Sequence, residues 1–554
     1  MANENNTNVD ENQEYDAEFV RNMEVIAARD PQSRTAEEDC MLASWYFMQS
    51  EGKDQELLQN AVDLLMRHAI TLYESPIWNY HVGMCYYYLR QPESAMRYLE
   101  KASADPEYTE PCTQYLNSCR ETLQVPVFAH NFAERCQECY RNLLEEVPRL
   151  LTDIRQQFES PEGISSELND RVRKLLNFAF ARVSFSISCE KEPGALVLDP
   201  VITIKPVGSI ARALQIRYFI EHAPGELTQL IRLRLGQQRD ESLRIPLNEG
   251  KDSAGLEDVS CYIARRNNDY NVYLYCSKLK DQLEANVYSA YSLYLSLAYA
   301  ALGELASLTQ HVTFDVIYDD KAPDDAQGEA VALTDLYQWL VNAGVRLDQS
   351  EDDLFTSSYR DYDFSVAPPS GAAGGCSASA TADRNVAPAT AAAAHEDSPE
   401  SAAAASSGSG DAVPAVNVLA DRTDIKTGSS RTFQLINEFS GNSYKMTDEL
   451  HQNGSVAGYL AVEAASVFGI NAKVSFDDLI GQIHDAINGS QDAQLGVVTG
   501  QAVGSHFYYI DFISWDLLSI LSNALAVFSK YGIKPSFGTF RRSVPTVFLS
   551  DRQE

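Results

Sequence analysis

The chain has few cysteines for its length and no recognisable export signal. Ten cysteines occur in 554 residues, spread from Cys40 to Cys376. A disulfide-stapled protein would instead cluster and pair its cysteines within a short chain, so we interpret these as reduced, mostly buried thiols. The first residues, MANENNTNVDENQEYD, lack the basic and apolar regions of a secretory signal. These absences predict a cytoplasmic protein.

Basic residues are also scarce. The chain has 44 Lys and Arg against 78 Asp and Glu, which gives a formal net charge of −34 and a pI near 4.6. A field of this sign repels phosphate backbones and anionic lipid headgroups. We therefore expect neither a nucleic acid nor a membrane as partner. The ordinary consequence of such a charge is solubility.

Long apolar runs are missing, but one uncharged segment is nearly long enough to cross a membrane. Residues 285–303, ANVYSAYSLYLSLAYAALG, carry no charge and approach the roughly 20 residues that cross a bilayer. The segment contains four Tyr, three Ser and an Asn, and no cluster of Lys or Arg flanks it. We predict a buried core helix here rather than a membrane span.

Motifs for common enzyme chemistry are absent. The chain has no GxxxxGK[ST], no GxGxxG after a strand, no HExxH and no GxSxG. The pair in CQEC, 136–139, has no second pair nearby to complete a zinc site, and it falls within a helical pattern. The acidic stretch at 315–325 lacks the spacing of a calcium loop. We predict no catalytic residue, metal or cofactor, and these absences favour a non-enzymatic protein over an enzyme.

The length and the changes in pattern predict several domains. Hydrophobic residues make up 45% of the chain, enough to form buried cores, and 554 residues are too many for one core. The expected fold class is α+β multidomain. We divide the chain into a disordered acidic tail at 1–16, helical repeats at 17–125, a long connecting helix at 126–160, an α+β domain at 161–350, a flexible Ala/Ser/Gly/Pro-rich linker at 366–418, and a C-terminal α+β domain at 419–554.

An internal repeat marks the helical region. Ala61 and Leu65 return 34 residues later as Ala95 and Leu99, within segments of helical periodicity. Further small, aromatic and turn-forming residues surround the second copy: Trp78, Gly83, Tyr86, Ala102 and Pro106.

This set resembles the tetratricopeptide repeat, a family of stacked helix pairs. The resemblance implies that Gly83 lets the first helix of a pair pack closely on Ala95 of the second, and that Pro106 closes the second helix. The chain departs from the family pattern at two positions, with Asn79 in place of an aromatic residue and Gln49 in place of a glycine. An unrelated array of helical hairpins is the alternative.

The resemblance implies a peptide-binding groove. In this family the first helix of each pair lines the groove, which points to Tyr80, Met84 and Tyr87, with Asn79 as a polar contact. The alternative is that Tyr80 and Tyr87 pack against the middle domain. Our main hypothesis is a non-enzymatic adaptor that binds a protein partner, in one version a toxin-neutralising or regulatory protein. The sequence identifies neither the partner nor the oligomeric state.

The C-terminal region offers a different hypothesis. HFYYIDFISWD, 506–516, alternates as a central strand covered on both faces and leads into a helix that ends at Gly532. The pieces YIDFISWD and FRR are similar to long bacterial tetratricopeptide-repeat proteins whose later domains have no assigned activity. Alternatively, Asp511, Arg541 and Arg542 line a pocket for a carboxylate or phosphate, as in an enzyme or a small-ligand-binding protein.

Overall fold

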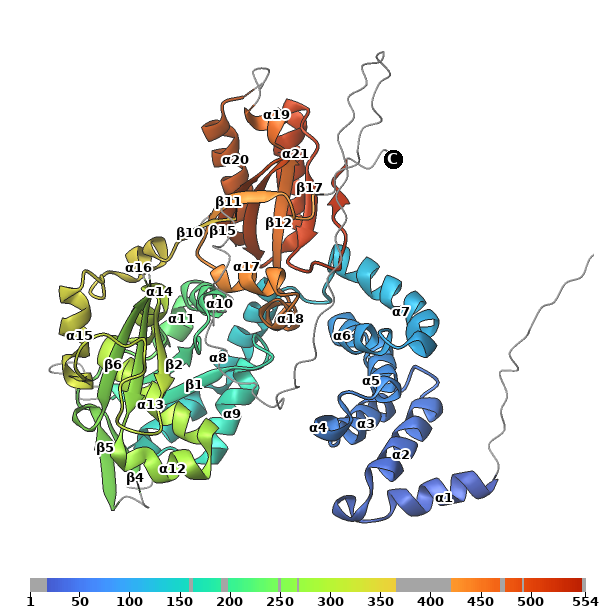
Figure 1. Ribbon diagram of the computed structural model, residues 1–554, viewed down its shortest axis with the longest axis horizontal. Coiled ribbons are helices and arrows are strands. Elements are labelled where there is room, and N and C mark those ends of the chain that lie inside the picture. Colours follow the sequence, from blue (N-terminus) through green and yellow to red (C-terminus); the bar gives the residue numbers. More distant parts are fainter. Residues whose placement is uncertain are drawn as a thin grey trace, which may run out of the picture. The chain divides into compact units, whose positions relative to one another are not determined.

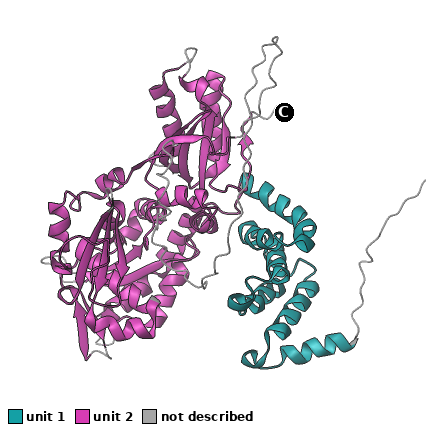
Figure 2. Cartoon of the chain, in the orientation of Figure 1, with its two compact units in different colours: residues 1–125 teal, residues 126–554 magenta. Residues whose placement is uncertain are grey.

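The structure is a computed structural model that describes residues 17–158, 163–190, 198–247, 251–266, 269–364, 420–468, 474–490 and 493–550. The predicted tail at 1–16 and the predicted linker at 366–418 lie outside these residues. The chain forms two compact units, unit 1 at 1–125 and unit 2 at 126–554 (Figure 2). Helices make up unit 1, and unit 2 contains helices and several sheets. The predicted α+β multidomain class is confirmed.

Unit 1 is a closely packed series of helices. Neighbours along the chain pack against one another, including α2 on α3, α5 on α6 and α6 on α7 (Figure 1). The side chains of Thr35, Asp54 and Asp105 accept backbone N–H groups at the start of α2, α3 and α7, so local capping residues define where these helices begin. The helices are α1 Ala17–Ala27, α2 Ala36–Gln49, α3 Gln55–Met66, α4 Ala69–Leu72, α5 Pro76–Tyr88, α6 Pro92–Ala102 and α7 Pro106–Gln124.

Gly83 is the point of close approach between α5 and α6. A Cβ atom at Gly83 would lie 2.7 Å from the Leu99 Cγ atom, too close for any other residue unless the Leu99 side chain or the helices shift. Ala95 is fully buried in α6. The expected close packing is thus present, with Leu99 rather than Ala95 as the nearest neighbour of Gly83.

The first part of unit 2 surrounds α8 with helices and three small sheets. The sheets have the strand orders β1-β2-β3, β4-β5 and β8-β7-β6-β9. The elements are α8 Phe132–Phe158, α9 Ser166–Leu176, β1 Ser184–Glu190, β2 Asp199–Lys205, α10 Ile210–Glu221, α11 Gly225–Thr228, β3 Arg232–Leu235, β4 Arg244–Leu247, β5 Asp252–Gly255, β6 Ser260–Arg266, β7 Asp269–Tyr275, α12 Lys280–Ala285, α13 Val287–Leu302, α14 Glu304–Thr309, β8 Val312–Val316, β9 Val331–Ala332, α15 Leu333–Asn342 and α16 Glu351–Ser357.

The second part of unit 2 is built on a seven-stranded sheet with the order β10-β11-β15-β16-β12-β17-β18 (Figure 1). All pairs in it are antiparallel. The elements are β10 Arg360–Asp363, β11 Ile425–Ser430, α17 Phe433–Ser440, α18 Lys445–Gln452, β12 Val456–Glu463, α19 Ala464–Phe468, α20 Phe476–Asn488, β13 Gly489–Ser490, β14 Ala493–Gln494, β15 Gly496–Gly504, β16 Phe507–Ser514, α21 Leu517–Tyr531, β17 Ser536–Thr539 and β18 Val547–Phe548.

The two parts of unit 2 share one hydrophobic core. Strand β10 precedes the segment 365–419 and strand β11 follows it, yet the two pair directly. The Trp515 ring packs 5.4 Å from that of Phe132 and 5.2 Å from that of Tyr218, measured between centroids. The Gln215 amide donates a 2.8 Å hydrogen bond to the Ser455 hydroxyl. Helix α8 therefore contributes to this core rather than only connecting two domains.

Two local predictions are confirmed in unit 2. The uncharged segment at 285–303 contains the helix α13, which buries Tyr294 and Leu297. Strand β16 is buried on both faces, and the helix that follows it ends at Gly532 in the left-handed conformation. Among the described residues, no helix combines the length and apolar composition that a bilayer crossing requires.

Candidate functional site

Four tyrosines form an array on two helices of unit 1. Tyr80 and Tyr87 lie seven residues apart on α5, and Tyr108 and Tyr115 have the same spacing on α7. Seven residues are nearly two helical turns, so each pair shares one face of its helix. The ring centroids of Tyr80 and Tyr108 lie 5.4 Å apart, and those of Tyr87 and Tyr115 lie 5.0 Å apart. These four residues are called the tyrosine array.

Aromatic contacts continue from the array toward α2. The Tyr88 ring lies 5.3 Å from Tyr87 and 5.6 Å from Phe47 of α2, between centroids. On the neighbouring turn, the Nδ1 atom of His81 lies 3.3 Å from the hydroxyl of Ser44. Side chains of α2, α5 and α7 therefore form one continuous aromatic surface. Helices α2 and α5 are each the first of a packed pair, and α7 is the last helix of unit 1.

The four tyrosines of the array are half-buried. Burial raises the pKa of Tyr80. Burial, and to a smaller extent the neighbouring tyrosines, raises the pKa of Tyr115 to about 12. The Tyr87 hydroxyl lies 3.2 Å from that of Ser118, which fixes its ring against α7. Tyrosines held in this way offer rigid apolar faces together with hydroxyl groups, the combination that is enriched at protein interfaces.

Of the four groove residues predicted from the sequence, only two lie on this surface. Tyr80 and Tyr87 belong to the array, whereas Asn79 and Met84 are buried. The Asn79 amide donates 2.8 Å hydrogen bonds to the backbone carbonyls of Tyr73 and Ser75, so it stabilises the turn before α5. The prediction that Asn79 and Met84 contact a partner is therefore wrong, because both face the interior of the helix stack.

The array also contains two residues that the sequence analysis missed. Tyr108 and Tyr115 lie on α7, which the repeat pattern treats only as a terminal helix. Their seven-residue spacing, identical to that of Tyr80 and Tyr87, is the signal in the sequence that points to them.

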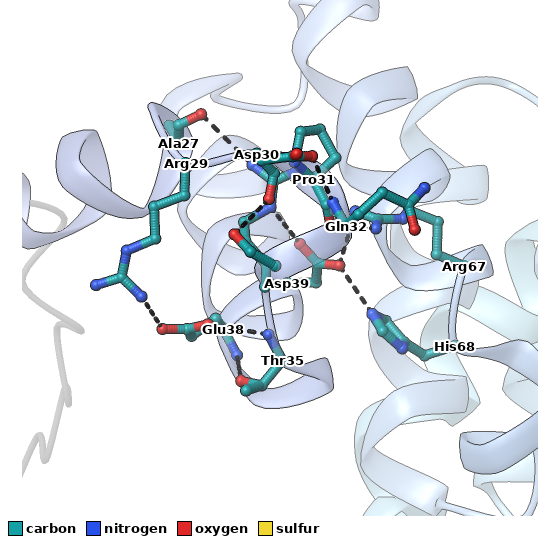
Figure 3. Close-up of polar contacts among 12 residues, drawn as sticks. Ala27, Arg29, Asp30, Pro31, Gln32, Thr35, Glu38, Asp39, Arg67 and His68 are labelled. Atoms are coloured by element: carbon teal, nitrogen blue, oxygen red, sulfur yellow. Dashed lines mark hydrogen bonds and ion pairs between the residues drawn. The ribbon is translucent and has the colours of Figure 1, made fainter.

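A buried carboxylate organises the other end of unit 1 (Figure 3). Asp39 has no exposed side-chain surface and lies 2.9 Å from the Arg34 Nε, 2.9 Å from an Arg67 nitrogen and 2.8 Å from the His68 Nε2. Ion pairs with two arginines and a hydrogen bond with His68 compensate the buried carboxylate, and these contacts join the start of α2 to the end of α3. We therefore assign this cluster a structural role, which is to hold α2 and α3 together, and no catalytic role.

The predicted ligand residues of unit 2 belong to separate structural contacts. Asp511 is fully buried and pairs with both terminal nitrogens of Arg422, one of them at 3.2 Å. Arg541 is also buried and donates a 2.6 Å hydrogen bond to Asp448, whereas Arg542 is exposed. The expected pocket of Asp511, Arg541 and Arg542 is therefore not formed, because the two buried groups are already neutralised by other residues.

The remaining chemical candidates are also structural. Cys136 and Cys139 are buried in α8, and burial raises the pKa of both thiols, that of Cys139 to about 12. Such thiols are poor nucleophiles and poor metal ligands. Within the described parts of the chain, no group of three or more His, Cys, Asp or Glu is placed to hold a metal ion.

Comparison with protein-family models, curated proteins and solved structures gave no match for this chain. Its function is therefore inferred from the geometry of its own residues.

Proposed function

We propose that the chain is a non-enzymatic cytoplasmic adaptor. Unit 1, as a tetratricopeptide-like array, holds a protein partner against the tyrosine array. The observation that carries this proposal is the alignment of two equally spaced tyrosine pairs on α5 and α7, with partly exposed rings in contact across the two helices.

The array is suited to a protein rather than to a small molecule. Its rings lie along a continuous helix surface, so a partner can contact several of them at once. Because they are already packed against one another, little side-chain freedom is lost when a partner binds. Tyrosine is among the residues that dominate binding energy at protein interfaces.

The opposite face of α7 has a different character. It exposes polar and acidic side chains along the helix, namely Thr109, Glu110, Thr113, Gln114, Asn117 and Glu121. A polar outer face is what closes the end of a helical repeat stack. The two faces of α7 therefore provide a binding surface and a matched control surface on one element.

The net charge favours a basic partner. At −34, the chain attracts a positively charged protein during encounter and disfavours an acidic one. Neutralisation of a basic toxin or regulation of a basic protein is the version of adaptor function that fits this charge.

The proposal is tested by affinity capture from a lysate of the native host. We expect the unmodified chain to retain a defined protein that the variant Tyr80→Ala/Tyr87→Ala loses. The control Thr109→Ala/Thr113→Ala, on the outer face of α7, is expected to retain it. Circular dichroism melting of all three chains checks the fold. Equal capture by the tyrosine variant, with its fold intact, contradicts the proposal.

A further inference from the structure

A groove of about 580 Å³ crosses one face of the seven-stranded sheet, far along the chain from the tyrosine array. It is called the sheet groove. Strands β10, β11, β15 and β16 form its floor, and residues of α19 and α20 form one end. The side chains used below are Asp361, Asp363, Gln501, Phe468, Phe476 and Tyr508.

The strand register explains how polarity changes along the groove. Asp363 pairs with Thr427, Thr427 with Val503, and Val503 with Tyr508, so these four side chains form one row across four strands. Adjacent strands lie about 4.8 Å apart, and the row is therefore about 14 Å long. It runs from an acidic end on the edge strand β10 to an aromatic end on β16.

The aromatic end is held open. The Phe468 ring stacks on that of Phe476 at 4.8 Å, and both rings meet Tyr508 edge-on at 5.7 and 5.2 Å, between centroids. Despite these contacts, 51% of the Phe468 surface is exposed. The Tyr508 hydroxyl donates a 2.7 Å hydrogen bond to the Gln501 Oε1, which leaves the Gln501 amide as a donor toward the groove.

The acidic end of the groove carries the negatively charged carboxylates of Asp361 and Asp363. The Asp361 side chain is exposed, and its carboxylate lies on the same face of β10 as that of Asp363. The floor between the two ends contains hydroxyl and apolar side chains. The groove thus complements a molecule that is apolar at one end and cationic at the other.

We propose that the sheet groove binds an extended segment of a second protein, with an apolar and a basic side chain four residues apart, so that both side chains point to the same face of the segment. Four residues of extended chain span about 13 Å, which matches the row of about 14 Å from the acidic end to the aromatic end. The net charge of the chain favours the approach of such a basic segment. This site is separate from the tyrosine array and gives the protein a second interaction surface.

The test uses the full chain and two synthetic peptides, acetyl-Phe-Gly-Gly-Gly-Arg-amide and acetyl-Phe-Gly-Gly-Gly-Glu-amide, in isothermal titration. The arginine peptide is expected to bind, and the glutamate peptide to bind at least about tenfold more weakly. Phe468→Ala and Asp361→Asn are each expected to weaken the arginine peptide about five- to tenfold. Both side chains are exposed, so these variants should melt like the unmodified chain.

Tyr80→Ala/Tyr87→Ala should bind the arginine peptide as tightly as the unmodified chain, which separates this proposal from that of the tyrosine array. No binding of the arginine peptide at millimolar concentration would overturn the proposal. Equal binding of both peptides, or binding indifferent to Phe468 and Asp361, would overturn it as well.

Discussion

Two fully buried carboxylates, one in each unit, are stabilised in different ways. Asp39 in unit 1 contacts three basic side chains, and two of these, Arg67 and His68, keep 32% and 19% of their side-chain surface in solvent. Asp511 in unit 2 pairs with Arg422, which is 2% exposed and is surrounded by aromatic rings within about 5 Å.

The difference shows how each unit is held together. The partners of Asp39 come from nearby helices, at most 29 residues away, and two of them reach water. Arg422 lies 89 residues before Asp511 and is almost completely removed from water. Breaking a pair costs most when the charge left behind cannot be hydrated, so the unit 2 pair should be the more sensitive.

The largest effect is expected from Arg422→Met. It leaves the Asp511 carboxylate buried without its cation, and the free energy of unfolding of unit 2 should fall by about 3–5 kcal/mol. Urea unfolding followed through tryptophan fluorescence, to which Trp515 of the same core contributes, measures this change. The double variant Arg422→Met/Asp511→Leu should recover at least half of the loss. A loss below about 1 kcal/mol for the single variant would break the comparison.

A smaller effect is expected from Asp39→Asn. The amide removes the charge that Arg34, Arg67 and His68 contact, but two of these groups can regain water, so the loss should be about 2 kcal/mol. The measurement is thermal unfolding of unit 1. Glu37→Gln, an exposed change on the same helical turn, serves as control with an expected change of about 0.5 kcal/mol or less. A loss as large as that of Arg422→Met would contradict the role assigned to solvent.

A third carboxylate, that of Glu438 in α17, extends the comparison to the dependence of stability on pH. Burial raises the pKa of Glu438 to about 7, against a partial offset from the Met446 N–H that it accepts at 2.8 Å. The folded chain then holds a proton that the unfolded chain releases near pH 4.5, so this group lowers stability as pH rises from about 4.5 to 7. Glu438→Gln removes that dependence.

Relative to the unmodified chain, Glu438→Gln should therefore gain about 1–2 kcal/mol between pH 5 and pH 8, allowing for the partial exposure of the side chain. Urea unfolding at the two pH values gives this difference directly. An equal change of stability with pH in both chains would show that the carboxyl titrates normally in the folded state.

Local pattern predicted much of the fold but only part of the site. Alternation in HFYYIDFISWD identified β16 as a strand buried on both faces. The tetratricopeptide resemblance implied the close approach of α5 and α6 at Gly83, although it named Ala95 rather than Leu99 as the neighbour. The partner of Asp511 could not be predicted, because five strands, β11 to β15, and four helices, α17 to α20, separate it from Arg422 in sequence. The pairing of β10 with β11 was hidden in the same way, since the segment 365–419 separates them.

In the candidate site, the family resemblance selected Tyr80 and Tyr87, which lie half-buried on the first helix of a pair, and their contact with a partner stays a prediction. It also selected Asn79 and Met84, since sequence spacing alone does not tell which side of a helix the neighbouring helices cover. Tyr108 and Tyr115 were missed for the opposite reason. They lie outside the matched repeats, and their role depends on α7 packing beside α5.

The most direct test of the adaptor proposal is site-specific photo-crosslinking. A photoreactive phenylalanine derivative is placed in the full chain at Tyr108, within the tyrosine array, or at Thr113, on the opposite face of α7, and each chain is irradiated in host lysate. We predict a discrete crosslinked protein from position 108 and none from position 113. The same product from both positions, or no product from position 108, would contradict the claim that the tyrosine array contacts a protein partner.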